Sequence, residues 1–85
     1  MRAIIFLPEA EQQYTYWRKY DKKTLVKVDK LIDEIIETPF EGSGKPEALK
    51  HNLKGCWSRR INKEHRLVYQ VTETKIIIIS CKFHY

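Results

Sequence analysis

The spacing of hydrophobic residues changes along the chain and divides it into predicted strands and helices. An apolar run, Ala3–Leu7, stops at Pro8 and predicts a first strand. Pro8 and the acidic residues after it favour a helix start, so a helix is expected over Glu9–Tyr20. Between residues 25 and 36 apolar residues recur every three or four positions, which predicts an amphipathic helix. Thr38-Pro39 ends that helix.

The C-terminal third alternates between apolar and polar residues and predicts three strands, Cys56–Ile61, His65–Val71 and Lys75–Phe83. Together these elements give the order β-α-α-β-β-β in a single domain, residues 1–85. The predicted fold class is therefore α+β, with two helices packed on one face of a mainly antiparallel sheet.

A loop at residues 40–49 separates the helices from the last strands and holds two of the chain's three glycines. Its length approaches that at which loops without secondary structure are usually functional. It lacks the Gly-Lys-Ser/Thr ending of a nucleotide-binding phosphate loop. Titratable side chains are dense in and just after it: Glu41, Lys45, Glu47, Lys50 and His51.

Three-residue turns between the last strands would place Arg60 opposite Arg66, and Arg66 opposite Ser80. This register separates polar from apolar side chains, because successive residues of a strand point to opposite faces. The polar face would carry Ser58, Arg60, Arg66, Ser80, Lys82 and His84. The core face would carry Trp57, Ile61, Leu67, Tyr69, Ile77, Ile79, Cys81 and Phe83, with His65 as a buried structural histidine.

Two directly opposed arginines destabilise a sheet by roughly 0.2–1 kcal/mol. A bound anion would benefit from that arrangement, whereas acidic side chains such as Glu41, Glu47 or Glu64 would neutralise it within the protein. The formal net charge of +5 fits a polyanionic or acidic protein partner, and also a basic protein without such a partner.

Cys56 and Cys81 lack metal-ligand spacing and any secretory context, so we expect buried free thiols, no metal and no cofactor. The N-terminal apolar run is too short for a signal peptide or a membrane span. The expected location is therefore the cytoplasm.

An imidazole close to guanidinium groups suggests chemistry at a phosphate. RNA is cleaved without a metal when its 2′-hydroxyl attacks the adjacent phosphorus. A base must take the hydroxyl proton, an acid must protonate the leaving oxygen, and cations must stabilise the charge that develops. The candidates are Glu47 as base, His84 as acid, Arg60, Arg66 and Lys50 as cations, and Tyr85, Arg59 and His51 as further RNA contacts.

The sequence resembles the Txe/YoeB toxins, which belong to the RelE superfamily of type II toxin–antitoxin systems. The resemblance covers nearly the whole chain and is less close over Glu9–Tyr20. The residues that carry it are Thr38-Pro39-Phe40-Glu41-Gly42, Gly44-Lys45-Pro46-Glu47, Leu49-Lys50-His51-Asn52-Leu53, Gly55, Trp57-Ser58-Arg59-Arg60-Ile61, Glu64-His65-Arg66-Leu67-Val68-Tyr69 and His84-Tyr85.

The resemblance implies a RelE-like, microbial-RNase-like fold and an endoribonuclease that cleaves mRNA in the ribosomal A site and inhibits translation. It implies Glu47 as general base, His84 as general acid and Arg66 as the residue that stabilises the transition state. Tyr85, Arg60 and Lys50 match supporting positions that contact the substrate.

The resemblance also implies a YefM/Phd-type antitoxin as partner, with contact to operator DNA only through that antitoxin, and it allows a homodimer. Two other functions stay open. One is a gyrase-inhibiting toxin of the ParE type, which shares the fold but needs no general acid. The other is an RNA-binding module without catalysis.

Overall fold

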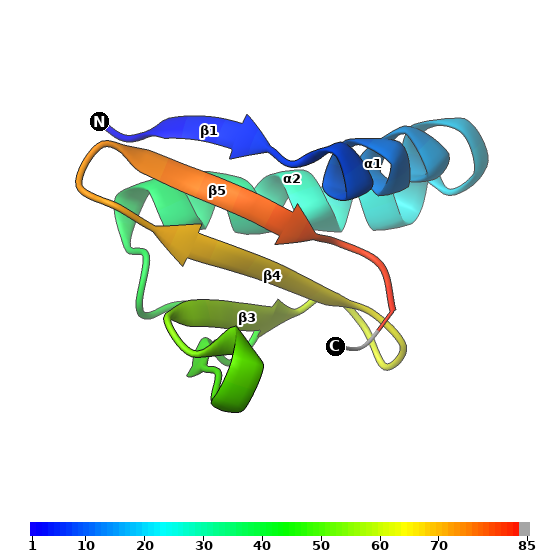
Figure 1. Cartoon of the computed structure of the whole chain (residues 1–85). Coiled ribbons are helices and arrows are strands. Elements are labelled where there is room, and N and C mark those ends of the chain that lie inside the picture. Colours follow the sequence, from blue (N-terminus) through cyan, green and yellow to red (C-terminus); the bar gives the residue numbers. More distant parts are fainter. Residues whose placement is uncertain (84–85) are drawn as a thin grey trace.

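The computed structural model describes residues 1–83, which form a sheet with two helices packed on one of its faces (Figure 1). The sheet has five strands in the order β1-β5-β4-β3-β2. The α+β class predicted from the sequence is confirmed. The elements in chain order are β1 (Ala3–Phe6), α1 (Pro8–Tyr20), α2 (Lys22–Glu37), β2 (Glu47–Ala48), the 3-10 turn η1 (His51–Leu53), β3 (Cys56–Arg60), β4 (Arg66–Val71) and β5 (Lys75–Ser80).

The sheet is mainly antiparallel, as predicted, with one parallel pair. β1 lies parallel to β5, so the first and last strands are neighbours, and β5 lies inside the sheet (Figure 1). The pairs β2–β3, β3–β4 and β4–β5 are antiparallel. β2 was not predicted, because a two-residue strand carries no alternating pattern that a sequence could show.

Both helices begin where local chemistry favours it. Pro8 starts α1, where its missing N–H leaves no helical hydrogen bond unmade. Asp21 caps α2 by accepting hydrogen bonds from the backbone N–H of Thr24 (3.1 Å) and its hydroxyl (2.8 Å). These bonds lower the pKa of Asp21. Neither α1 nor α2 combines the length and apolar character that crossing a bilayer requires.

The core lies between the helices and the sheet and contains the predicted apolar stripe of α2. Trp17 of α1 is also buried there, and the hydroxyl of Tyr14 donates a 2.6 Å hydrogen bond to Asp29 of α2. That bond raises the pKa of Tyr14 to about 12. Tyr16 and Tyr20 of the same helix are exposed.

The predicted register of the last strand is wrong. β5 ends at Ser80, and Tyr69 pairs with Ile78, because the turn is one residue longer than expected and a bulge follows Val68. Ser80 consequently lies opposite Val68 and not opposite Arg66. A further error shares this cause: Ile76 and Ile78, not Ile77 and Ile79, lie in the core beneath the helices. Phe83 was also predicted in the core but is 60% exposed, because the strand has ended before it.

Cys56 and Cys81 are buried free thiols, as predicted. Cys81 is 0% exposed, and its burial raises the pKa of the thiol to about 12. Burial also raises the pKa of Cys56, which is 9% exposed. A protonated, inaccessible thiol is a poor nucleophile, so neither cysteine is suited to covalent chemistry.

We expect iodoacetamide at about pH 8 to leave both thiols of the folded protein largely unmodified, because alkylation needs an exposed thiolate. Cys56 should react first, since it is the more exposed of the two. Mass spectrometry after timed quenching measures this, and the protein in denaturant, where both thiols should react quickly, is the control. Rapid labelling of Cys81 without denaturant would contradict the buried position.

Candidate active site

The hairpin of β3 and β4 places two arginines side by side. Arg60 lies opposite Arg66, as the three-residue turn between these strands predicted. Arg60 is exposed and Arg66 is half-buried. The guanidinium of Arg66 donates a 3.3 Å hydrogen bond to the carbonyl of Asn62 in the turn. The pair concentrates positive charge at one end of the sheet.

Strand β2 brings Glu47 to the same face. Glu47 lies opposite Ser58, and Ser58 precedes Arg60 by two residues on β3. Directly opposed residues, and residues two apart on a strand, point to the same face of a sheet. A pocket of about 190 Å³ is lined by Gly44, Lys45, Glu47, Ser58, Arg60 and Arg66. The structure thus brings the carboxylate of Glu47 together with two guanidiniums that follow it in the sequence by 13 and 19 positions.

Gly44 allows the loop before β2 to lie against β3. Its carbonyl accepts a 2.6 Å hydrogen bond from the backbone N–H of Arg60. Its φ is +80°, and a Cβ at this position would lie 2.9 Å from the carbonyl oxygen of Arg60. Glycine is therefore required both for the backbone conformation and for the close approach. This contact fixes the start of the segment that carries Glu47.

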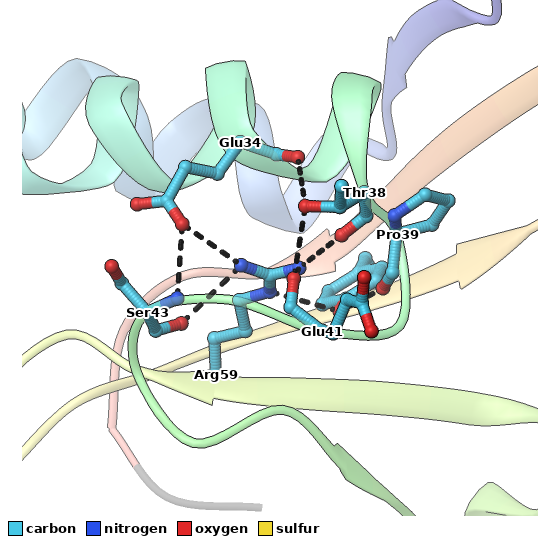
Figure 2. Close-up of polar contacts among 7 residues, drawn as sticks. Glu34, Thr38, Pro39, Glu41, Ser43 and Arg59 are labelled. Carbon is cyan, nitrogen blue, oxygen red and sulfur yellow. Dashed lines mark hydrogen bonds and ion pairs between the residues drawn. The ribbon is translucent and has the colours of Figure 1, made fainter.

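Arg59 does not share this face, although the sequence suggested it as an RNA contact. It is 0% exposed, and its side chain points toward the loop that follows α2 (Figure 2). Its guanidinium donates hydrogen bonds to the carbonyls of Thr38 (2.6 Å), Glu41 (2.8 Å) and Ser43 (3.3 Å). It also donates to the hydroxyl of Tyr69 (3.1 Å). Arg59 is a buried structural cation and cannot reach RNA at the surface.

Glu34 of α2 completes this group of contacts (Figure 2). Its carboxylate lies 3.6 Å from Arg59 and accepts a 2.9 Å hydrogen bond from the backbone N–H of Ser43. The hydrogen bond from Ser43, with a smaller effect of Arg59, lowers the pKa of Glu34. The hydroxyl of Tyr69 in turn donates to the carbonyl of Pro39 (2.7 Å). Arg59 therefore ties the loop to both α2 and β4.

Lys50 and His51 follow β2 and are both exposed. With Glu47 they line a second hollow of about 520 Å³, which neither of the two arginines lines. His51 has a φ of +60°, which turns the chain into η1. Glu47 thus lies between the arginine pair and these two predicted RNA contacts.

The other predicted catalytic residues, His84 and Tyr85, lie outside the described residues. Phe83, to which position 84 is joined, is itself bonded to the site. Its carbonyl accepts a 3.1 Å hydrogen bond from the backbone N–H of Arg66. The described chain therefore returns from β5 to the start of β4 and ends beside one of the two arginines.

Lys45 is a site residue that the sequence did not single out. It has a φ of +52° and lines the pocket with Glu47 and the arginines. The sequence showed it only as one of several titratable residues in the loop and as part of the stretch that resembles the family. Among residues 1–83 no three His, Cys, Asp or Glu side chains gather in a way that could hold a metal ion.

Comparison with known proteins identifies the family. The model of the YoeB-like toxin of bacterial type II toxin-antitoxin systems matches residues 6–85. The chain belongs to this family. The YoeB toxin of Escherichia coli strain K12 is 51% identical over 82 residues, which cover 96% of this chain and 98% of that protein.

Two solved structures of YoeB-like toxins from Staphylococcus aureus closely resemble the fold. One is a YoeB dimer, with a TM-score of 0.93 and 49% identity over 99% of this chain and 98% of that one. The other is a heterotetrameric YoeB–YefM toxin–antitoxin complex, with a TM-score of 0.92 and 49% identity over 100% and 99% of the two chains. The YoeB-like fold predicted from the resemblance is therefore confirmed.

Proposed function

We propose that this YoeB-like toxin is a ribosome-dependent endoribonuclease, an mRNA interferase, which cuts mRNA in the A site and so inhibits translation. The observation that supports this most strongly is the pocket in which Glu47 faces the opposed pair Arg60 and Arg66. Two opposed arginines disfavour the sheet by themselves, whereas a phosphate between them would gain two planar, charged hydrogen-bond donors.

In the proposed reaction the RNA supplies its own nucleophile. Glu47 takes the proton of the 2′-hydroxyl, and the 2′ oxygen forms a bond to the adjacent phosphorus. Arg66, with Arg60, stabilises the negative charge on the phosphorane. His84 donates a proton to the 5′ oxygen as the bond from phosphorus to that oxygen breaks. The products are a 2′,3′-cyclic phosphate and a 5′-hydroxyl.

The remaining predicted residues hold the substrate. Lys50 and His51 contact the RNA beyond Glu47, where they line the neighbouring hollow. Tyr85 stacks on a base or positions the phosphate, as its place next to His84 in the sequence suggests. Arg59 takes no part in binding, because the loop carbonyls already use its guanidinium.

The proposed partners follow from the target and from the relatives. Ribosomes and mRNA place the protein in the cytoplasm. The S. aureus complex supports an antitoxin of the YefM type, and the S. aureus dimer supports a homodimer. The +5 charge suits an acidic antitoxin segment as well as RNA. Operator DNA would be contacted only through the antitoxin.

Primer extension on an mRNA incubated with translating ribosomes tests this proposal. Over a short incubation we expect discrete in-frame cuts with the intact protein and none with His84→Gln, because glutamine donates no proton to the leaving oxygen; only much longer incubation should reveal the residual reaction of the variant. The same mRNA without ribosomes is the control. Growth arrest without cuts would favour a gyrase-inhibiting toxin of the ParE type. Arrest by both proteins without cuts or DNA damage would favour an RNA-binding module.

A further inference from the structure

The segment Cys81–Phe83 leaves the sheet after β5 but is bonded at both ends. Residues near a chain end usually have few fixed partners. Here the N–H of Cys81 donates to the side-chain oxygen of Gln13 (2.6 Å), and its carbonyl accepts from the indole N–H of Trp17 (2.9 Å). Both partners belong to α1. The helix therefore holds the backbone at the point where the strand has ended.

The other end of the segment is held by the start of β4. The N–H of Phe83 donates to Nδ1 of His65 (2.7 Å), and its carbonyl accepts from the N–H of Arg66 (3.1 Å). The indole of Trp17 meets the His65 ring edge-on at 4.7 Å between centroids, which links the two halves of the arrangement. Nδ1 of His65 must keep its lone pair to accept this bond.

Burial of the side chain does not explain the conformation of Phe83, whose ring centroid lies 5.7 Å from that of His65. The φ of Phe83 is +64°, a region that residues other than glycine rarely adopt, and its ring is 60% exposed. Strained backbone of this kind persists only where surrounding contacts enforce it, and it concentrates at functional sites. The hydrogen bonds from Phe83 to His65 and Arg66 are such contacts. They fix the backbone of the last described residue, to which position 84 is joined.

Lys82, between the two bonded residues, is held against α1. Its ammonium lies 3.4 Å from the centroid of the Tyr16 ring and 5.7 Å from that of Trp17. A cation over an aromatic face is attracted by the ring's negative potential. Lys82 therefore adds to the attachment of the segment.

We propose that Gln13, Trp17 and His65 are positioning residues for the catalytic end of the chain. They fix the backbone of residues 81–83 so that the general acid proposed at position 84 is joined to the protein beside Arg66. This rests on the proposed function, since it assigns a role relative to His84. The proposal also gives α1 a role in the reaction besides core packing. This helix is the part of the chain whose sequence resembles the family least.

Gln13 offers the cleanest test, because it is half-buried and lies outside the buried core cluster. Gln13→Leu removes the acceptor for Cys81 at similar size, and Gln13→Glu keeps an acceptor. Gln12→Leu, on the exposed side of the same helix, is the matched control. A misplacement of about 1 Å at a reacting group costs up to about 10²-fold in rate. We expect Gln13→Leu to slow single-turnover cleavage on ribosomes by about 10- to 100-fold at unchanged ribosome affinity.

Two comparisons distinguish a positioning role of Gln13 from a contribution to stability alone: the Gln13→Glu variant, and Gln13→Leu in a His84→Gln background. Gln13→Glu and Gln12→Leu should cut at nearly the wild-type rate. In a His84→Gln background, Gln13→Leu should slow the residual reaction no further, because it acts through residue 84. Equal rates for Gln13→Leu and the wild type would overturn the proposal. So would an equal loss in both backgrounds, which would indicate a general effect on the fold.

Hydrogen exchange separates failure of this inference from failure of the proposed function. The amides of Cys81 and Phe83 should be protected in the intact protein. Gln13→Leu should speed exchange of the Cys81 amide, and His65→Leu should speed exchange of the Phe83 amide. Unprotected amides would overturn the inference whatever the activity. Protected amides in a wild-type protein that cuts no mRNA would overturn the nuclease proposal and, with it, the role assigned relative to His84.

Discussion

Replacing Arg66 with alanine should slow mRNA cleavage by about 10²- to 10³-fold, the effect typical of removing one preorganised donor from a developing oxyanion. Arg66 lines the pocket with Glu47, and the carbonyl of Asn62 orients its guanidinium before any substrate arrives. The variant should fold normally, because the substitution removes a like-charge contact with Arg60. Single-turnover primer extension with saturating ribosomes measures the rate.

Ribosome affinity distinguishes catalysis from docking. We expect Arg66→Ala to bind ribosomes almost as tightly as the intact protein, since it removes one charge from a strongly basic surface. Arg66→Lys should recover only part of the rate, because an ammonium cannot present two parallel donors to a phosphate. Sedimentation with ribosomes provides the binding measurement. If affinity fell as far as the cleavage rate, Arg66 would be a docking residue.

Replacing Arg59 with methionine should destabilise the protein much more than the same replacement of Arg60, the other arginine of β3. The substitution removes a charged donor from the carbonyls of Thr38, Glu41 and Ser43. The first two keep one neutral donor each within the loop, the N–H of Glu41 and the hydroxyl of Thr38. Each buried acceptor left unsatisfied costs about 1–3 kcal/mol. The loop is at the surface and water can reach part of it. We therefore expect the lower end of that range for each of the three carbonyls, about 3 kcal/mol in all. For a domain of this size, that lowers Tm by roughly 12–24 °C.

The neighbouring arginine provides a matched control. Arg60→Met changes the same residue type one position along the strand, but this side chain is exposed and opposes Arg66. We expect its free energy of unfolding to stay within about 0.5 kcal/mol of the intact protein, or to rise slightly. Urea unfolding followed by circular dichroism compares the two variants. Equal stability of Arg59→Met and Arg60→Met would contradict the buried role of Arg59.

The sequence predicts those parts of the fold where only one face of an element is apolar. Spacings of three and four in α2 leave one possible buried stripe, and it is the stripe observed. In β5 the four consecutive isoleucines, residues 76–79, are equally apolar in both registers, so the pattern could not choose between them. The turn length decided the register, and the sequence does not show it.

The sequence predicted the part of the candidate site that lies on the hairpin of β3 and β4. That hairpin gave the Arg60–Arg66 pair, and alternation put His65 on the core face, where it is 9% exposed. Arg59 was expected as an RNA contact, and its burial was not predicted, because the partners that make a buried arginine acceptable there are loop carbonyls. Backbone groups leave no trace in a sequence. The roles of His84 and Tyr85 stay predictions.

The parallel pairing of β1 with β5 has a consequence for handling the protein. β5 carries four adjacent isoleucines, a segment of high β-propensity without charge or proline, and β1 covers its outer edge (Figure 1). An uncovered strand of this kind is a template for intermolecular pairing and amyloid-like growth. Lys75 and Lys82 flank it with positive charge, which opposes such growth. Shortening the N-terminus would therefore convert a well-folded toxin into an aggregation-prone one.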